Sequence, residues 1–265
     1  MQPSNESTID SFIAQTARST VAVIVPLYGY WNDVPNNPLL AEPVLSLVLN
    51  RLYSNVHQLF VIFVANPETI QNEPGNPTSV ANILLSKAQA GNTKNLPVPR
   101  TATYAEYLST GMQYALTETK AQFIVSFNPW VMIQEGGLDI LVDRANRSDE
   151  AKAISGYDLR SVIQPEQFEE YKNPMLKEQW DISFDFFCMP RFAAEMVKWD
   201  PSYRTHWFMQ QDVAQQLKHL GFAAINYPQA GMFPFEFPWK SYETEDDKIA
   251  DQHTFAQKWG FSLAG

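Results

Sequence analysis

Short apolar runs alternate with longer amphipathic segments through the first half of this 265-residue chain, and this alternation strongly constrains the fold. A continuous apolar run is typical of a strand that is buried on both faces. Parallel neighbouring strands need crossover connections, and helical segments supply them here. The order therefore predicts an α/β fold with a doubly wound, mostly parallel sheet and helices on both faces. The expected strands are 21–28 (VAVIVPLY), 58–65, 95–99 and 121–127, and the expected helices are 39–54, 78–92 and 104–120.

The second half is less regular, and 160–181 is a polar, charged segment with little periodicity. The segment 229–251 is rich in proline, aromatic and acidic residues, which is typical of a surface loop or lid. The other expected elements are helices at 136–150, 191–199 and 209–220 and strands at 151–159, 182–190 and 222–227. The predicted division is an N-terminal extension (1–20), a first half (21–135), a second half (136–228) and a C-terminal lid or tail (229–265).

The composition limits the partners. With 29 acidic and 19 basic side chains the net charge is −10, which disfavours nucleic acid and anionic lipid as partners. No segment approaches the roughly 20 apolar residues of a membrane span, and the N-terminus lacks the pattern of a signal peptide. We therefore expect a cytoplasmic protein without a transmembrane segment. The single cysteine, Cys188, lies in an apolar run and is expected to be a buried small hydrophobe.

In an open α/β sheet, ligands bind beyond the carboxyl ends of the strands. The informative loops are therefore 28–38, 65–77, 99–104 and 127–136. The sequence contains neither a Walker-type phosphate loop nor a G-x-G-x-x-G fingerprint, and it has no C-x-x-C or H-E-x-x-H motif. The sequence therefore contains none of the motifs by which ATPases, dinucleotide-dependent dehydrogenases and common zinc sites are usually recognised.

Several blocks occur in a characteristic order: "VAVIVPLYGYWND", "QLFVIFVANPETI", "TGMQYALTETKAQFIVSFNPWV", "CMPRFAAEMVKWDPSYRTHWFMQQDVAQQLKHLGF" and "FAQKWG". Together they resemble the family 2 glycosyltransferases, which have the GT-A fold. The resemblance covers roughly residues 20–230 and extends to the block in the tail. It implies that 21–135 is the nucleotide-sugar-binding half and that 136–228 is the acceptor-binding half. It implies transfer of a sugar from a nucleotide-diphosphate sugar, commonly a UDP-sugar, to the hydroxyl of a glycan or another acceptor.

The chemistry that the resemblance implies needs a general base for the acceptor hydroxyl and positive charge for the departing diphosphate. In the family, an acidic pair that opens a late helix supplies the base. Here that helix is expected to open with Gln210, Gln211 and Asp212, so Asp212 is the candidate base. An aspartate in the first turn of a helix also complements the helix dipole without any catalytic role, and both readings stay open.

The other acidic landmarks of the family are absent. The end of the second strand reads Ala65-Asn66, and the D-x-D position reads Phe127-Asn128-Pro129. The helix motif Ala-Arg-Asn of the family is replaced by Tyr107-Leu108-Ser109. The resemblance implies a Mn²⁺ or Mg²⁺ ion, but neutral amides are poor sole ligands for these cations. The sequence therefore places metal-dependent transfer in doubt and favours a metal-independent mechanism.

Other side chains can bind the substrate. Pro26, Tyr28, Asn66 and Asn128 follow or end the strands on the expected ligand side. Arg100 follows the third strand, and there a guanidinium can bind phosphates. His206 and Trp207 stand shortly before Asp212, and an aromatic plane there could stack on a sugar or simply pack.

Lys240 and His253 lie in the tail, where a closing lid would bring cations to the phosphates; His253 is also the weak candidate for a metal ligand. Two main hypotheses follow. The first is an inverting glycosyltransferase with Asp212 as base. The second is an inactive GT-A-like module, a pseudoenzyme with a degenerate D-x-D motif that binds a glycan or a partner transferase. A third is a different nucleotide-utilising enzyme on the same sheet.

Overall fold

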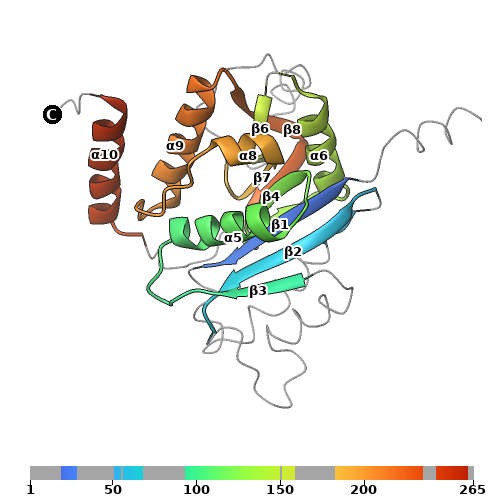
Figure 1. Ribbon diagram of the computed structural model, residues 1–265, viewed down its shortest axis with the longest axis horizontal. Coiled ribbons are helices and arrows are strands. Elements are labelled where there is room, and N and C mark those ends of the chain that lie inside the picture. The colour runs from blue at the N-terminus through green and yellow to red at the C-terminus, as the bar shows by residue number, and fades with distance from the viewer. Residues whose placement is uncertain are drawn as a thin grey trace, which may run out of the picture.

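The computed structural model describes residues 19–28, 51–54, 56–67, 93–149, 151–158, 183–234 and 243–261. Across these residues, eight strands form one sheet in the order β3-β2-β1-β4-β7-β6-β8-β5 (Figure 1). The strands are β1 (Thr20–Leu27), β2 (Gln58–Ala65), β3 (Thr93–Pro97), β4 (Phe123–Phe127), β5 (Val131–Ile133), β6 (Ala151–Asp158), β7 (Phe186–Pro190) and β8 (Ala223–Pro234). The helices are α5 (Tyr104–Glu118), α6 (Gly137–Arg147), α8 (Arg191–Met196), α9 (His206–His219) and α10 (Glu245–Trp259).

The sheet is mixed but mostly parallel. Strand β1 pairs in parallel with β2 and β4, β2 pairs in parallel with β3, and β6 pairs in parallel with β8. Strand β7 is antiparallel to both β4 and β6, and the short β5 is antiparallel to β8. The predicted α/β class with a mostly parallel sheet is confirmed. The predicted helix 78–92, the polar segment 160–181 and all but the end of the predicted helix 39–54 lie outside the described residues.

The continuous apolar sequence of β1 follows from burial on both faces. Side chains alternate across a strand, so Val21, Val23 and Val25 belong to the hydrophobic cluster that includes α6, whereas Ala22 and Ile24 belong to the cluster that includes α5 and α9. All five are fully buried. Figure 1 shows α6 on one side of the sheet and α5 on the other. From Val21 to Leu27 the strand accordingly contains no polar side chain.

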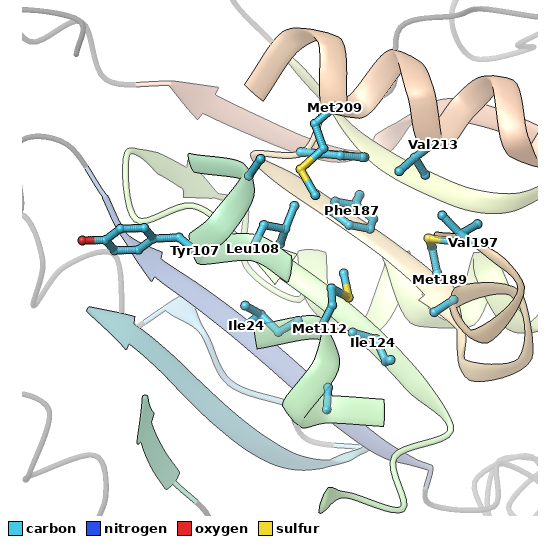
Figure 2. Close-up of a cluster of buried hydrophobic side chains, with 14 of the residues drawn as sticks. Ile24, Tyr107, Leu108, Met112, Ile124, Phe187, Met189, Val197, Met209 and Val213 are labelled. Carbon is cyan, nitrogen blue, oxygen red and sulfur yellow. The ribbon is translucent and has the colours of Figure 1, made fainter. Parts of the chain in front are cut away.

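Helix α5 lies very close to β1 and β2. Figure 2 shows Leu108 and Met112 of α5 in one apolar cluster with Ile24 of β1 and with residues of β7 and α9. Gly111 permits the close approach, because a methyl group added there would lie 2.4 Å from Cγ2 of Ile24 and 3.1 Å from Cγ2 of Val64. Helix packing against the centre of the sheet therefore depends on the missing side chain at this position.

The start of α5 is held by a capping box. The Thr103 side chain accepts a hydrogen bond from the backbone N–H of Glu106, and the Glu106 carboxylate accepts one from the N–H of Thr103. The Thr103 hydroxyl also donates to the carbonyl oxygen of Tyr203, at 3.2 Å. This contact ties the start of α5 to the segment that precedes α9.

The C-terminal segment differs from its prediction. The expected loop or lid at 229–251 is wrong in two places, because β8 continues to Pro234 and α10 begins at Glu245. Strand β8 continues because, after a register shift, it pairs with the end of β6 and then with β5. The acidic run that suggested a loop is the first turn of α10, which Thr244 and Asp247 close with a second capping box. Acidic side chains in a first turn complement the helix dipole.

Two other boundaries also moved. Helix α9 begins at His206, before the expected start at residue 209, and ends near Gly221, whose φ of 79° is in the left-handed region. The strand predicted at 121–127 begins at Phe123 and ends at Phe127, as β4, and the short strand β5, which was not predicted, follows at Val131. Within the described part of the chain, no helix is both long and apolar enough to cross a bilayer.

Replacing Gly111 with alanine tests the close packing of α5. In an open helix this change would be stabilising. Here the added methyl group overlaps Ile24, so we expect the free energy of unfolding to fall by about 1–3 kcal/mol. Gln113→Ala, on the exposed side of the same helix, is the matched control and should change little. Urea denaturation followed by circular dichroism measures both, and a stabilised Gly111→Ala protein would contradict the packing.

Candidate active site

The carboxyl ends of β1, β2 and β4 meet at one edge of the sheet, because these strands are parallel and adjacent. Tyr28 follows β1, Asn66 follows β2 and Asn128 follows β4, and all three are buried. The sequence predicted substrate contacts at these three residues, and the structure brings them to the same edge. This edge is the place where an open α/β sheet binds its ligands.

Asp185 places a carboxylate beside Asn128. The Asn128 side-chain amide donates to Oδ1 of Asp185 at 3.0 Å, and the Asn128 backbone N–H donates to the Asp185 carbonyl oxygen at 2.6 Å. The other carboxylate oxygen accepts from the Ser183 hydroxyl at 3.1 Å. Sequence reasoning missed Asp185, because the contact arises only from the antiparallel pairing of β7 with β4. The motif "FDFF" gave no signal of this partner.

The chain reverses direction directly after Asn128. Its side-chain oxygen accepts a hydrogen bond from the backbone N–H of Trp130 at 3.3 Å, and its carbonyl oxygen accepts one from the N–H of Val131. This local bonding is typical of asparagine in turns and explains the interruption between β4 and β5. Asn128 is thus held by the turn on one side and by Asp185 on the other.

The residues at the D-x-D position fit a divalent cation poorly. Asp185 is the carboxylate bonded to Asn128, and each of its side-chain oxygens already accepts a hydrogen bond. Magnesium and manganese favour anionic oxygen ligands, which an asparagine does not supply. Among the described residues no group of three or more histidine, cysteine or acidic side chains is placed to hold a metal ion. The donor set is therefore not that of a dedicated metal site.

Three tyrosines form an aromatic layer behind the edge. Tyr28 lies edge-to-face with Tyr104 at 5.7 Å and with Tyr107 at 5.4 Å between ring centroids. Burial, and then the charge of Glu243, raise the pKa of Tyr28; burial and the charge of Asp185 raise the pKa of Tyr104. Both phenols are therefore protonated at neutral pH and can act as hydrogen-bond donors.

His206 and Glu243 form a second polar pair. His206 is the first residue of α9, and its Nδ1 atom lies 2.8 Å and 2.9 Å from the two carboxylate oxygens of Glu243. Burial lowers the pKa of His206, but the hydrogen bond and charge of Glu243 outweigh burial and raise it. The His206 ring also packs edge-to-face on Tyr104, with 5.8 Å between centroids. The start of α9 and the segment before α10 thus meet beside the tyrosine layer.

Asp212 lies in a different environment. It is 1% exposed, and its carboxylate accepts hydrogen bonds from Trp259 Nε1, Lys258 Nζ and Gln216 Nε2, each at 2.8 Å. Two of these donors belong to α10, so the carboxylate joins α9 to α10. Asp212 lies in the second turn of α9, so the alternative that it complements the dipole from the first turn is wrong. The role of general base remains a prediction, and it would require these donors to move.

The other predicted residues are more scattered. Pro26 is buried within β1, and Arg100 is exposed in the turn that follows β3. Trp207 is 43% exposed beside His206. His253 is exposed on α10, two residues after the buried Asp251, and Lys240 lies outside the described residues.

A cavity of about 540 Å³ lies at the opposite end of the strands. It is lined by residues at the start of β1 and β4 and by side chains of α6, including Ser19, Gln122, Asp139 and Asn146. Its position beyond the amino ends of the parallel strands separates it from Asn128 and Asp185. We therefore place the candidate active site at the carboxyl edge and not at this cavity.

Comparison with solved structures identifies the fold. A mannosyltransferase from Pyrobaculum calidifontis, solved with GDP-Man and Mn²⁺, superposes with a TM-score of 0.59 at 14% identity, over 94% of this chain and 66% of that one. Glucosyl-3-phosphoglycerate synthase from Mycobacterium tuberculosis, solved with Mn²⁺, UDP and phosphoglyceric acid, gives 0.56 at 13% identity, over 100% and 86%. TarS residues 1–349 from S. aureus give 0.56 at 12%, over 93% and 67%.

These proteins are GT-A glycosyltransferases, and the chain has the predicted α/β GT-A fold. The chain spans just under two thirds of the length of the mannosyltransferase. No protein-family model matches the sequence, and no curated protein matches it. At this level of identity the similarity defines the fold, and the activity must be argued from the site.

The buried cluster around Asp212 makes a thermodynamic prediction. Asp212→Asn removes the charge that Lys258 and Trp259 bind, so we expect the free energy of unfolding to fall by about 2 kcal/mol. Lys258→Met should cost a similar amount, and the double variant should cost less than the sum of the two. Glu118→Gln, at an exposed carboxylate of α5, is the control. Additive effects in urea denaturation would contradict a coupled pair.

Proposed function

We propose that the protein binds a nucleotide-diphosphate sugar at the carboxyl edge of β1, β2 and β4 and transfers the sugar, with inversion, to an acceptor hydroxyl. The observation that carries this proposal is the hydrogen-bonded pair Asn128–Asp185 beside the buried phenols of Tyr28 and Tyr104. It forms a polar site at the edge where a GT-A sheet presents its ligand site. The fold is that of proteins solved with GDP-Man and with UDP, and this similarity supports a nucleotide-sugar donor.

The leaving diphosphate needs hydrogen-bond donors or cations. Since the donor set at Asn128 and Asp185 fits a divalent cation poorly, we propose a metal-independent transfer. Protonated phenols at the edge can donate to phosphate oxygens, and Arg100 follows β3 on the same side of the sheet. Asn66 and Tyr28 would contact the nucleoside, beside the buried Pro26, and the exposed Trp207 would pack on the acceptor.

A second candidate function is a GT-A module that binds its ligand without catalysis. It is favoured by the neutral residues at the two places where the resemblance implies acids that are missing here: Ala65-Asn66 and Phe127-Asn128-Pro129. It is also favoured by Asp212, whose carboxylate is occupied by three donors. Both functions include binding of a nucleotide, so binding alone does not discriminate between them. Turnover does, because only the enzyme releases the nucleotide diphosphate.

Binding of UDP-glucose and GDP-mannose in EDTA and in Mn²⁺ tests the donor site. We expect one of the two to bind with a similar dissociation constant in both buffers. Asn128→Ala should weaken binding about tenfold, through the loss of about 1.4 kcal/mol of hydrogen bonding. Asp185→Asn should change it less than about threefold, because no metal depends on the charge. Isothermal titration calorimetry measures the dissociation constant of the wild-type protein and of both variants. Asn146→Ala, at the cavity on the opposite end of the strands, is the control.

Binding that appears only with Mn²⁺ and disappears in Asp185→Asn would overturn metal independence and assign Asp185 as a metal ligand. Absence of binding by either nucleotide sugar, by UDP and by GDP would overturn the donor site itself. Release of free nucleotide diphosphate from the bound donor supports the enzyme. Binding without release over hours supports the module.

A further inference from the structure

The pair formed by His206 and Glu243 has the geometry of a base and its positioning group. We propose that His206 is the general base that accepts the proton of the acceptor hydroxyl, and that Glu243 positions its imidazole. This inference rests on the proposed function and names a base that is not the predicted Asp212. It is supported by the tautomer, the location and the charges of the pair.

The tautomer follows from the hydrogen bond. A carboxylate accepts hydrogen bonds only, so Nδ1 of His206 must carry a proton when it bonds to the Glu243 oxygens at 2.8 and 2.9 Å. In the neutral ring the lone pair is then on Nε2. Among the described residues none forms a hydrogen bond with Nε2, and the His206 side chain is 47% exposed whereas that of Glu243 is 8% exposed. A buried acid thus holds a half-exposed base in its accepting form.

The location is the carboxyl edge. His206 contacts Tyr104, Tyr104 contacts Tyr28 at the end of β1, and Tyr104 also responds to the charge of Asp185. Only the ring of Tyr104 therefore separates the imidazole from Tyr28, one of the residues that we propose to bind the donor sugar nucleotide. Asp212 is six residues further along α9, with its carboxylate turned to α10. Of these two titratable side chains, His206 is the one in contact with the layer at the edge.

The charges around His206 come from three neighbouring segments. Glu243 before α10 and Asp185 before β7 favour the protonated ring, and Lys248 of α10 opposes it, while Tyr104 of α5 is neutral. The net effect raises the pKa of His206 above its usual value, so the neutral, basic form is lost as the pH falls through this raised pKa. Activity should therefore rise with pH through this titration.

The step is balanced by the groups named. Nε2 of His206 takes the proton from the acceptor hydroxyl while the oxygen of that hydroxyl forms a bond to the anomeric carbon of the donor sugar. The bond between that carbon and the diphosphate oxygen breaks, and the nucleotide diphosphate leaves with the electron pair. His206 then returns the proton to water. With water in place of the acceptor the same step is hydrolysis of the donor, so the test needs no knowledge of the acceptor.

A purely structural role of the pair is the competing explanation. The Thr205 side chain makes no capping bond, and Glu243 instead accepts a hydrogen bond from the backbone N–H of His206 at 2.9 Å. Glu243 therefore also caps α9. A cap would affect stability but would not make the rate follow the titration of His206, so the pH profile discriminates between the two roles.

Histidine NMR provides the first test, because the chain has four histidines. In long-range ¹⁵N spectra we expect His206 to be protonated on Nδ1 at high pH and to titrate above its usual pKa. Glu243→Gln should lower this pKa, and a UDP or GDP that binds should shift the Nε2 signal. A neutral ring protonated on Nε2, or an Nε2 signal that bound nucleotide leaves unchanged, would overturn the proposal.

The kinetic test follows release of nucleotide diphosphate from UDP-glucose or GDP-mannose across pH. His206→Gln should lower kcat at least about 100-fold and remove the acidic limb of the profile, with donor affinity changed less than about threefold. Glu243→Gln should move that limb to lower pH. His219→Gln, at the other end of α9, is the matched control. If Asp212→Asn removes the limb and His206→Gln keeps it, Asp212 is the base and the proposal is wrong.

Failure of this assignment is distinguishable from failure of the proposed function. Loss of donor binding in the wild-type protein overturns the donor site, whatever the histidine does. Donor binding together with a wild-type rate equal to that of His206→Gln overturns the base alone. A rate lost in His206→Gln with an unchanged pH profile in Glu243→Gln keeps His206 and overturns the positioning role of Glu243.

Discussion

The antiparallel pairing of β7 with β4 is the interaction on which the candidate active site depends. Residues that follow β4 lie beside residues that precede β7, so Asp185 meets Asn128 across the strand pair. With a parallel neighbour, the residue preceding the strand would lie at the opposite end, and Asn128 would have no carboxylate partner. The mixed sheet therefore returns one acid to a position where the local sequence has none. The carboxylate of Asp185 is hydrogen-bonded to the side-chain amide of Asn128, and the pair therefore fits a divalent cation poorly.

Burial on both faces of the sheet explains why the sequence predicted the fold well. The apolar run of β1 admits few alternatives, since each of its faces contacts a separate hydrophobic cluster. Helix α5 was equally clear, because its spacing and its Thr103–Glu106 capping box are local features. The connection between β4 and β5 was harder to predict. Asn128 was recognised as the end of β4, but the turn that leads to β5 depends on its own side-chain hydrogen bond.

In the candidate site, Tyr28, Asn66 and Asn128 were predicted because each follows or ends a strand, and His206 was singled out because it stands shortly before Asp212. Asp185 and Glu243 were not predicted. Asp185 is 57 positions from Asn128, and Glu243 is 37 positions from His206. Such pairs arise from topology, and no local pattern encodes them. The acidic segment around Glu243 was read as a surface loop for the same reason, since the capping role of its carboxylate is visible only beside α9.

The position of α10 connects stability to the proposed chemistry. Two buried carboxylates, one on each side of the contact, bind α10. Asp212 of α9 accepts hydrogen bonds from Lys258 and Trp259 of α10. Asp251 of α10 accepts hydrogen bonds from the backbone N–H groups of Arg204 and Thr205 and from the Thr205 hydroxyl. Glu243 precedes this helix, so its contact with His206 requires α10 to be docked. A change at Asp212 would then lower activity without Asp212 touching the substrate, because it would release the segment that orients the imidazole. Loss of activity alone therefore cannot identify the base, whereas a rate that follows the titration of one side chain can.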